Sequence, residues 1–192
     1  MQKQSFKQFV FNALLLENTF DNMEKEGIPI RIGQAIQPIL SIDEYDFSPR
    51  IRNDANKMSS IYVGFFCLEN SVRELIVQRL SERKGIDWWE NFVPKKIQEN
   101  VQRRKTDELK KKYHYAQRSS TDIGYVTFGN LAQIITCNWE DFSDLFPDQA
   151  WISSRFNDLE TSRNIIMHSG VLPEIEIDRI ESIVRDWIRQ VG

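Results

Sequence analysis

The stretch that decides the fold is QAWISSRFNDLETSRNIIMHSG, residues 149–170. At about 100° per residue, its apolar side chains fall on one broad arc, as in a helix that packs against a core. These side chains are Trp151, Ile152, Phe156, Leu159, Ile166 and Met167. Asp148 is a suitable N-cap and Gly170 a suitable stop. We therefore predict a helix over about 149–169.

Arg163 projects into this apolar arc. A guanidinium keeps its charge, so placing it against a core is costly unless a carboxylate, an interface or a phosphate receives it. Glu69 is the candidate partner, because it is also a charged residue on an apolar helical stripe. We predict that these two side chains approach each other, within one chain or across a dimer. Alternatively, Glu69 pairs with Arg73 one turn later.

His168 lies five residues after Arg163, which in a helix is about 140° further around and roughly 7.5 Å along the axis. Asn164 lies beside His168 on the less apolar side, where its amide can hydrogen-bond to a ligand or a neighbour. Long side chains can bridge part of the gap between the arginine and the histidine. The alternative is that His168 only caps the helix end.

Further helices are predicted on both sides of this stretch. Their approximate ranges are 5–23, 54–84, 94–115, 128–139 and 173–190, with a loop over 119–125. Residues 27–49 hold glycines and prolines among short apolar runs, which indicates an irregular, partly extended segment. Helix 54–84 carries its apolar residues on one stripe: Met58, Tyr62, Phe65, Val72, Ile76 and Leu80, with Glu69 among them.

Length and composition favour one globular domain, and the predicted helices make its class all-α. The 192 residues are 41% hydrophobic and 28% charged, which is enough apolar material for one substantial core. We expect a helical body over 60–192, with an N-terminal helix and a wrapping segment over 1–59. No apolar run reaches the length of about 20 residues that a membrane span needs, and the first apolar run has no cleavage site behind it. A cytoplasmic location is therefore expected.

The two cysteines give no sign of a metal site. Cys67 and Cys137 each lie inside an apolar stretch, with no histidine or second cysteine at ligand spacing. We expect both to be small buried hydrophobic residues, and we expect neither a metal nor another cofactor.

A basic segment over 95–118 stands out against the formal net charge of −3, since it holds nine basic and three acidic residues. It could track a phosphate backbone, or it could be a solvated helix face. Its candidate RNA contacts are Arg103, Arg104, Lys110, Lys111, Lys112 and His114. The tryptophans at 88, 89, 139 and 187 could stack bases, but their apolar surroundings favour roles as core anchors.

Three features together resemble the HEPN family. They are Arg163-Asn164 followed by His168 near a helix end, the sequence LENSVRELI at 68–76 on a long preceding helix, and the tryptophan pair at 88–89 after a glycine. The pattern is similar to a HEPN subtype also found appended to eukaryotic transcript-surveillance nucleases. The likeness covers roughly 60–187 and implies a HEPN-like helical bundle.

The resemblance also implies an activity. Many HEPN proteins are RNA-cleaving toxins or antiviral-defence effectors that use the 2′-hydroxyl of RNA as nucleophile without a metal. By this likeness His168 would transfer protons, Arg163 would stabilise phosphoryl charge and Asn164 would position either His168 or the phosphate. The charge pairing on the helices adds Glu69, which could orient Arg163, and Arg73 as supporting residues. Family members usually pair, which implies a homodimer with a composite site, and an antitoxin or another defence-system protein is a possible partner.

Two alternatives stay open at this point. The chain could be a non-catalytic HEPN module that binds RNA or a partner protein, or a structural helical protein in which the motif is accidental. One departure from the family pattern concerns regulation. Toxins silenced by nucleotide transfer often carry a tyrosine two residues after the histidine, where this chain has Gly170. That form of silencing is therefore not expected.

Overall fold

The computed structural model describes residues 46–110 and 116–191. All of them belong to the second of the two units into which the chain divides, Glu44–Gly192. The predicted N-terminal helix, nearly all of the irregular segment over 27–49, and the candidate RNA contacts Lys111, Lys112 and His114 lie outside the described residues. The single-domain organisation stays a prediction.

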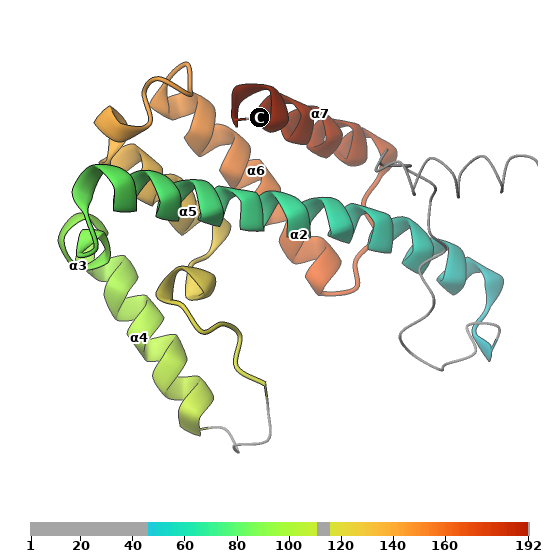
Figure 1. The fold of residues 1–192 in the computed structure, drawn as a ribbon. Helices are drawn as coiled ribbons and strands as arrows, with labels where there is room; N and C mark the ends of the chain where they lie inside the picture. Colours follow the sequence, from blue (N-terminus) through green and yellow to red (C-terminus); the bar gives the residue numbers. More distant parts are fainter. Residues whose placement is uncertain (1–45, 111–115, 192) are drawn as a thin grey trace, which may run out of the picture. The chain divides into compact units, whose positions relative to one another are not determined.

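The described residues form helices and no strand, which confirms the all-α class (Figure 1). The α-helices are α2 (Pro49–Lys84), α3 (Trp88–Phe92), α4 (Lys95–Lys110), α5 (Phe128–Cys137), α6 (Gln149–Met167) and α7 (Glu174–Val191). Two short 3₁₀ helices, η2 (Asp122–Tyr125) and η3 (Trp139–Asp141), connect them. Each predicted helix in this range is present, although α2 begins earlier than expected and α5 ends two residues sooner.

Helix α2 is the central helix of the unit, and α5, α6 and α7 pack along it (Figure 1). Pro49 occupies its first turn, where the missing N–H costs nothing. The helix ends at Lys84, and the capping residue Gly85 has a φ of 83°, in the left-handed region that glycine adopts without strain. The buried side of α2 is Met58, Phe65, Leu68, Glu69, Val72, Ile76 and Leu80.

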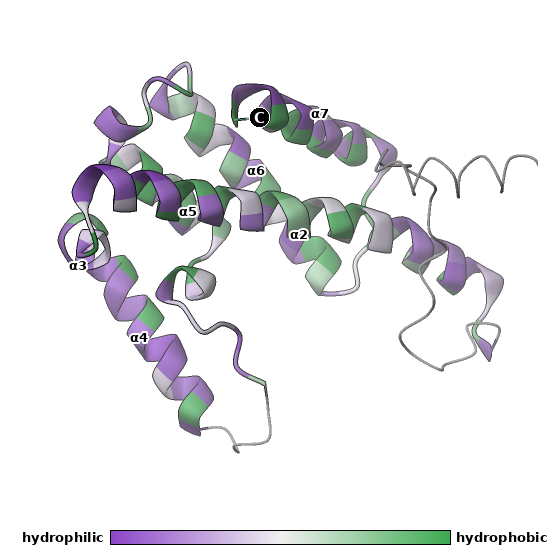
Figure 2. Ribbon diagram, in the orientation of Figure 1, coloured by the Kyte–Doolittle hydropathy of each residue, from purple (hydrophilic) through white to green (hydrophobic). Residues whose placement is uncertain are grey.

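Aromatic side chains from four parts of the chain form the centre of the core. The Phe128 ring packs edge-on against Phe156, with centroids 5.3 Å apart, and also against Phe65. Trp187 of α7 contacts the Phe156 ring, and its indole N–H donates to Ser71 Oγ at 3.0 Å. Helix α5 is hydrophobic along most of its length and α4 is mostly hydrophilic (Figure 2). Helix α5 therefore lies in the core, while α4 buries only one side.

The tryptophans act mainly as core anchors, as their surroundings predict. Trp88 and Trp187 are buried, and Trp89 and Trp139 are partly buried against the same core. Their rings are therefore engaged in packing and are poorly placed to stack on bases.

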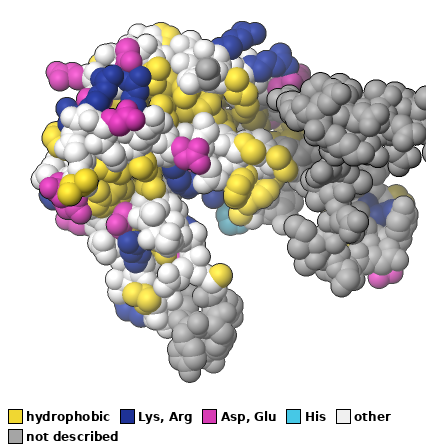
Figure 3. Space-filling model, viewed as in Figure 1, with side chains coloured by type: hydrophobic (Ala, Val, Ile, Leu, Met, Phe, Trp, Pro, Cys, Tyr) yellow, Lys and Arg dark blue, Asp and Glu magenta, His cyan; other side chains and the backbone are white. Residues whose placement is uncertain are grey.

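Several burial predictions are wrong. Cys67 and Cys137 are exposed, because the first lies on the side of α2 away from the core and the second is the last residue of α5. Tyr62 is 44% exposed although it falls on the apolar stripe of α2, and Met167 in the last turn of α6 is 48% exposed. Figure 3 shows hydrophobic side chains that remain exposed along α2. Where Tyr62 and Met167 lie, α2 and α6 border a pocket, so both side chains stay exposed.

No helix in the described part of the chain is long and apolar enough to cross a membrane.

Candidate functional site

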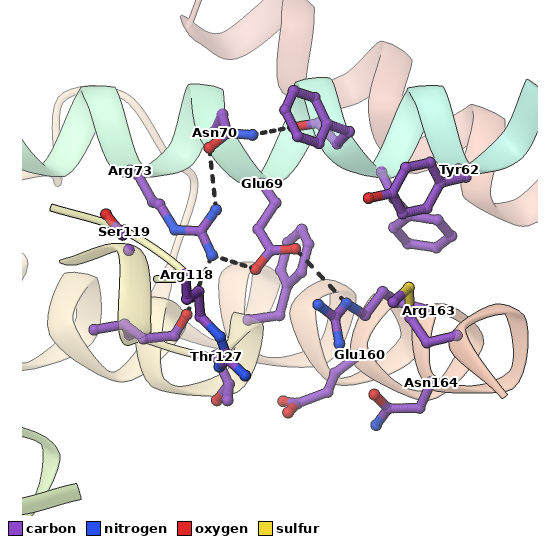
Figure 4. A pocket seen from close by; sticks show the side chains of 16 residues that line it. Tyr62, Glu69, Asn70, Arg73, Arg118, Ser119, Thr127, Glu160, Arg163 and Asn164 are labelled. Atoms are coloured by element: carbon purple, nitrogen blue, oxygen red, sulfur yellow. Dashed lines mark hydrogen bonds and ion pairs between the residues drawn. The ribbon is translucent and has the colours of Figure 1, made fainter. Parts of the chain in front are cut away.

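A pocket of about 520 Å³ opens between α2, α6 and the segment that runs from Arg118 to Phe128 (Figure 4). Its polar lining comprises Glu69, Asn70, Arg73, Arg118, Ser119, Thr127, Glu160, Arg163 and Asn164. Aromatic and other apolar side chains complete the lining, among them Tyr62, Phe66 and Met167. The pocket therefore combines several guanidinium groups with an apolar wall.

Glu69 lies between two arginines at the base of this pocket. Its side chain is 11% exposed, and its Oε1 accepts a hydrogen bond from Arg73 Nη2 at 2.5 Å. Its Oε2 lies 3.7 Å from Arg163 Nε (Figure 4). The predicted approach of Arg163 to Glu69 is thus confirmed within one chain. The alternative pair with Arg73 forms at the same time, so one carboxylate serves two cations.

Arg73 uses its guanidinium to hold the loop that closes the pocket. Besides Glu69, it donates to Asn70 Oδ1 at 3.2 Å and to the carbonyl oxygens of Ile123 and Val126, both at 3.3 Å. A guanidinium has five N–H donors in a fixed fork, and here most of them have protein acceptors. Arg73 is therefore chiefly structural: it ties the η2 region to α2.

Arg163 has a different role, because its contact with Glu69 is an ion pair with 3.7 Å between Nε and Oε2 and not a hydrogen bond. Its Nη1 and Nη2 make no hydrogen bond with any residue that the structure describes, and its side chain is 37% exposed. Figure 4 shows the guanidinium in the pocket, and Asn164, the next residue of α6, also lines it. The two terminal nitrogens can therefore bind an anionic ligand that enters the pocket, while Glu69 holds the inner edge of the group.

Glu160 lines the same pocket, but its carboxylate is already engaged. Its Oε2 accepts the backbone N–H of Gly129 at 2.7 Å, in the first turn of α5. A carboxylate is favourable there because the first N–H groups of a helix lack intrahelical acceptors. A side chain at position 129 would meet this carboxylate at 2.4 Å, so glycine permits the close approach.

Arg118 contributes a further guanidinium at the mouth of the pocket. Its side chain is 55% exposed and stacks over the Tyr125 ring, with 6.0 Å between the Arg118 Cζ and the ring centroid. Nearby, Arg104 donates from Nη1 to the Tyr125 carbonyl oxygen at 2.5 Å. Burial, followed by the charges of Arg118 and Arg103, lowers the pKa of Arg104 from its ordinary value. Arg118 also pairs with Glu108, with 3.7 Å between Nε and Oε1, so its positive charge at the pocket is partly balanced.

All three predicted RNA contacts in the described residues, Arg104, Arg103 and Lys110, lie outside the pocket lining. Arg103 is exposed on α4 and donates to Asn100 Oδ1 at 3.1 Å. Lys110 is exposed at the end of α4, 3.6 Å from Asp107. Both positions fit the reading of α4 as a largely solvated basic face, and their contact with RNA stays a prediction.

His168 caps the C-terminus of α6. Its backbone N–H donates to the carbonyl oxygens of Asn164 and Ile165 at 3.2 Å, and its side chain is exposed. The next residue, Ser169, has a φ of 61°, and the Gly170 N–H closes the turn on the Ile165 carbonyl at 2.8 Å. His168 is not part of the pocket lining. A single chain thus brings Arg163, Asn164, Glu69 and Arg73 together and leaves the imidazole at the helix end.

Sequence reasoning missed several residues of the pocket: Tyr62, Phe66, Arg118 and Glu160. The basic excess over 95–118 was a signal for Arg118, which ends that segment. The described residues contain no group of three or more His, Cys, Asp or Glu side chains that could hold a metal ion.

These features define an all-α domain with an arginine-lined pocket beside a helix that ends in an Arg-x4-His motif. The chain belongs to the HEPN family, because the sequence model of the family described as Swt1-like HEPN matches residues 64–192, more than half of the chain. No curated protein and no solved structure gives a significant match. Membership of the HEPN family is thus confirmed, while the likeness to domains appended to eukaryotic transcript-surveillance nucleases stays a prediction.

Proposed function

We propose that this HEPN domain is a metal-independent endoribonuclease that acts as a toxin or an antiviral-defence effector. The observation that carries the proposal is the set of contacts that the Arg163 guanidinium makes. Its Nε is held by the buried Glu69, while its two terminal nitrogens point into the pocket without a hydrogen-bond partner among the described residues. A guanidinium arranged in this way binds a phosphate through charge-assisted hydrogen bonds.

The proposed reaction uses a nucleophile that RNA itself carries. The 2′-oxygen attacks the adjacent phosphorus, and the bond from phosphorus to the 5′-oxygen of the next nucleotide breaks. His168 accepts the 2′-proton or donates a proton to the leaving 5′-oxygen. Arg163 stabilises the charge that develops on the non-bridging phosphoryl oxygens, and Asn164 positions the phosphate. The products are a 2′,3′-cyclic phosphate and a 5′-hydroxyl.

The position of His168 supports a site composed of two chains. The imidazole is exposed outside the pocket lining, so it would reach the scissile bond at the rim or across an interface. Apolar side chains next to the motif, Ile165, Met167 and Val171, are 41, 48 and 51% exposed. Burial of these side chains in a homodimer would be favourable, and a two-fold axis would bring both copies of the motif to one cleft.

The test is cleavage of mixed single-stranded RNAs by the full chain in EDTA. We expect products with 2′,3′-cyclic phosphate ends, and we expect the His168→Ala variant to lose that activity. Arg189→Ala is the control, because Arg189 is an exposed arginine near the end of α7. If a well-folded preparation leaves all RNAs intact, or if His168→Ala cleaves like the wild type, the proposal is wrong.

A second candidate is a non-catalytic HEPN module that binds RNA or a partner protein, such as an antitoxin or another defence-system component. The exclusion of His168 from the pocket lining favours this candidate, since one chain alone does not bring His168 and Arg163 into the same pocket. Under this reading RNA or the partner binds without being cleaved. Arg163→Ala then alters dimerisation or partner binding, and His168→Ala has little effect.

A further inference from the structure

Tyr62 and Phe66 form an exposed aromatic wall on one side of the pocket. They lie one turn apart on α2, their ring centroids are 6.4 Å apart, and the rings are tilted by 44°. Tyr62 is 44% exposed and Phe66 is 59% exposed. Phe65, between them in the sequence, is only 2% exposed because it faces the core. The wall is therefore a surface feature that core packing does not explain.

The wall and the cations border the same cavity. Tyr62 and Phe66 line the pocket together with Arg163 and Arg118, and Figure 4 shows the Tyr62 ring near the Arg163 side chain. Leaving two rings in water forfeits the free energy of their burial. A pocket of about 520 Å³ is within the usual size range for small-molecule sites. The pocket thus offers a surface that suits a flat apolar group and, beside it, guanidinium groups that suit an anion.

We propose that the pocket binds one unpaired nucleotide of RNA, with its base on the aromatic wall and its phosphate on Arg163. The inference rests on the proposed action on RNA and specifies the substrate as single-stranded. Bases in a duplex are stacked on each other, whereas unpaired bases can turn outward and stack on aromatic side chains. The aromatic wall should therefore select RNA that has an unpaired nucleotide. Which base that nucleotide carries should matter little.

The test measures binding of a short 2′-fluoro RNA that carries 2-aminopurine flanked by uridines. The 2′-fluoro sugar has no nucleophile, so the wild-type chain can be used without cleavage. We expect binding to quench the 2-aminopurine fluorescence. Tyr62→Ala and Phe66→Ala should each weaken binding roughly five- to thirtyfold and reduce the quenching. Tyr62→Phe should keep both, because it preserves the ring.

Two controls separate stacking from other effects. Val63→Ala changes a neighbouring residue of α2 that is 55% exposed but does not line the pocket, so binding should stay as in the wild type. An abasic oligomer of the same backbone should bind the wild type and both alanine variants equally. Far-UV circular dichroism and denaturant unfolding check that each variant is folded.

The possible failures can be told apart. If the wild type does not bind single-stranded RNA at all, the proposed action on RNA fails. If the wild type binds RNA but the alanine variants at 62 and 66 bind equally well, only the aromatic wall is refuted. If those variants convert a dimer to a monomer in sedimentation and bind the abasic oligomer as weakly as the RNA, the wall is a contact between copies, and the inference is overturned.

Discussion

The two halves of α6 differ in what they bury. In the first half, Ile152, Phe156 and Leu159 are at most 1% exposed and fill the core between α2, α5 and α7. In the second half, Asn164, Met167 and the capping His168 are exposed. One helix therefore has a half that stabilises the fold and a half that presents chemical groups. Substitutions in the two halves should separate stability from activity.

The largest effect is expected from Phe156→Ala in the first half. Phe156 is 1% exposed and contacts the rings of Phe128 and Trp187, so its loss leaves a cavity among aromatic side chains. The free energy of unfolding should fall by about 3–5 kcal/mol. Urea unfolding measures this change. The neighbouring Asn157→Ala, at an exposed position, should change it by less than about 0.5 kcal/mol.

The next largest effect is expected from Arg163→Ala in the second half, and it should be on activity. Removal of the group that stabilises phosphoryl charge should lower the cleavage rate by about 10²–10³-fold. The free energy of unfolding should change by no more than about 1 kcal/mol, because Arg73 still neutralises Glu69. RNA cleavage and urea unfolding are measured on one preparation. A loss of stability as large as that of Phe156→Ala would contradict the division of α6.

Arg73→Ala sharpens the comparison, because Arg73 and Arg163 share Glu69. Arg73 also holds two backbone carbonyl groups of the η2 region, and its side chain is only 16% exposed. Its loss leaves these acceptors and part of the carboxylate without donors, which should cost about 2–3 kcal/mol of unfolding free energy. Hydrogen exchange should show faster opening around Ile123. If Arg73→Ala is as stable as the wild type, the structural role of Arg73 is wrong.

Sequence reasoning predicted the features that depend on local periodicity. Charged residues on apolar stripes identified the pair of Arg163 and Glu69, although the stripes alone could not decide between one chain and two. The N-cap of α6 is also as predicted, since Asp148 Oδ1 accepts the Trp151 N–H at 2.7 Å. Both features follow from the chemistry of a helix and from the cost of an unpaired buried charge.

The pocket itself could not be predicted, because it depends on where helices stop covering one another. Periodicity placed Tyr62 on the core stripe, but no helix among residues 46–110 and 116–191 covers that turn of α2, and Tyr62 lines the pocket. Arg118 and Glu160 are far apart in sequence and share the pocket only after the chain has folded. The predicted position of His168 relative to Arg163 was approximate for a related reason. Its residue leaves the helical conformation, with a φ of −101° and a ψ of 23°.

The smallest effect is expected where α6 ends. Ser169 has a φ of 61°, a left-handed conformation that costs a non-glycine residue about 1–2 kcal/mol. Ser169→Gly relieves this strain but loses about 0.5–1 kcal/mol through the greater freedom of the unfolded chain. The net result should be a gain of about 0.5–1 kcal/mol in unfolding free energy, measured by urea denaturation.

Gly170→Ala is the matched substitution, and it should lower the free energy of unfolding, whereas Ser169→Gly should raise it. A methyl group at position 170 would lie 2.8 Å from the Ile165 carbonyl oxygen and 2.5 Å from its Cγ2, so the capping turn must open. Because His168 is held by this same turn, Gly170→Ala should lower the RNA-cleavage rate more than its loss of stability explains, whereas Ser169→Gly should leave the rate unchanged. Equal rates in the two variants would show that the imidazole does not depend on the cap, and the end of α6 would then be structural only.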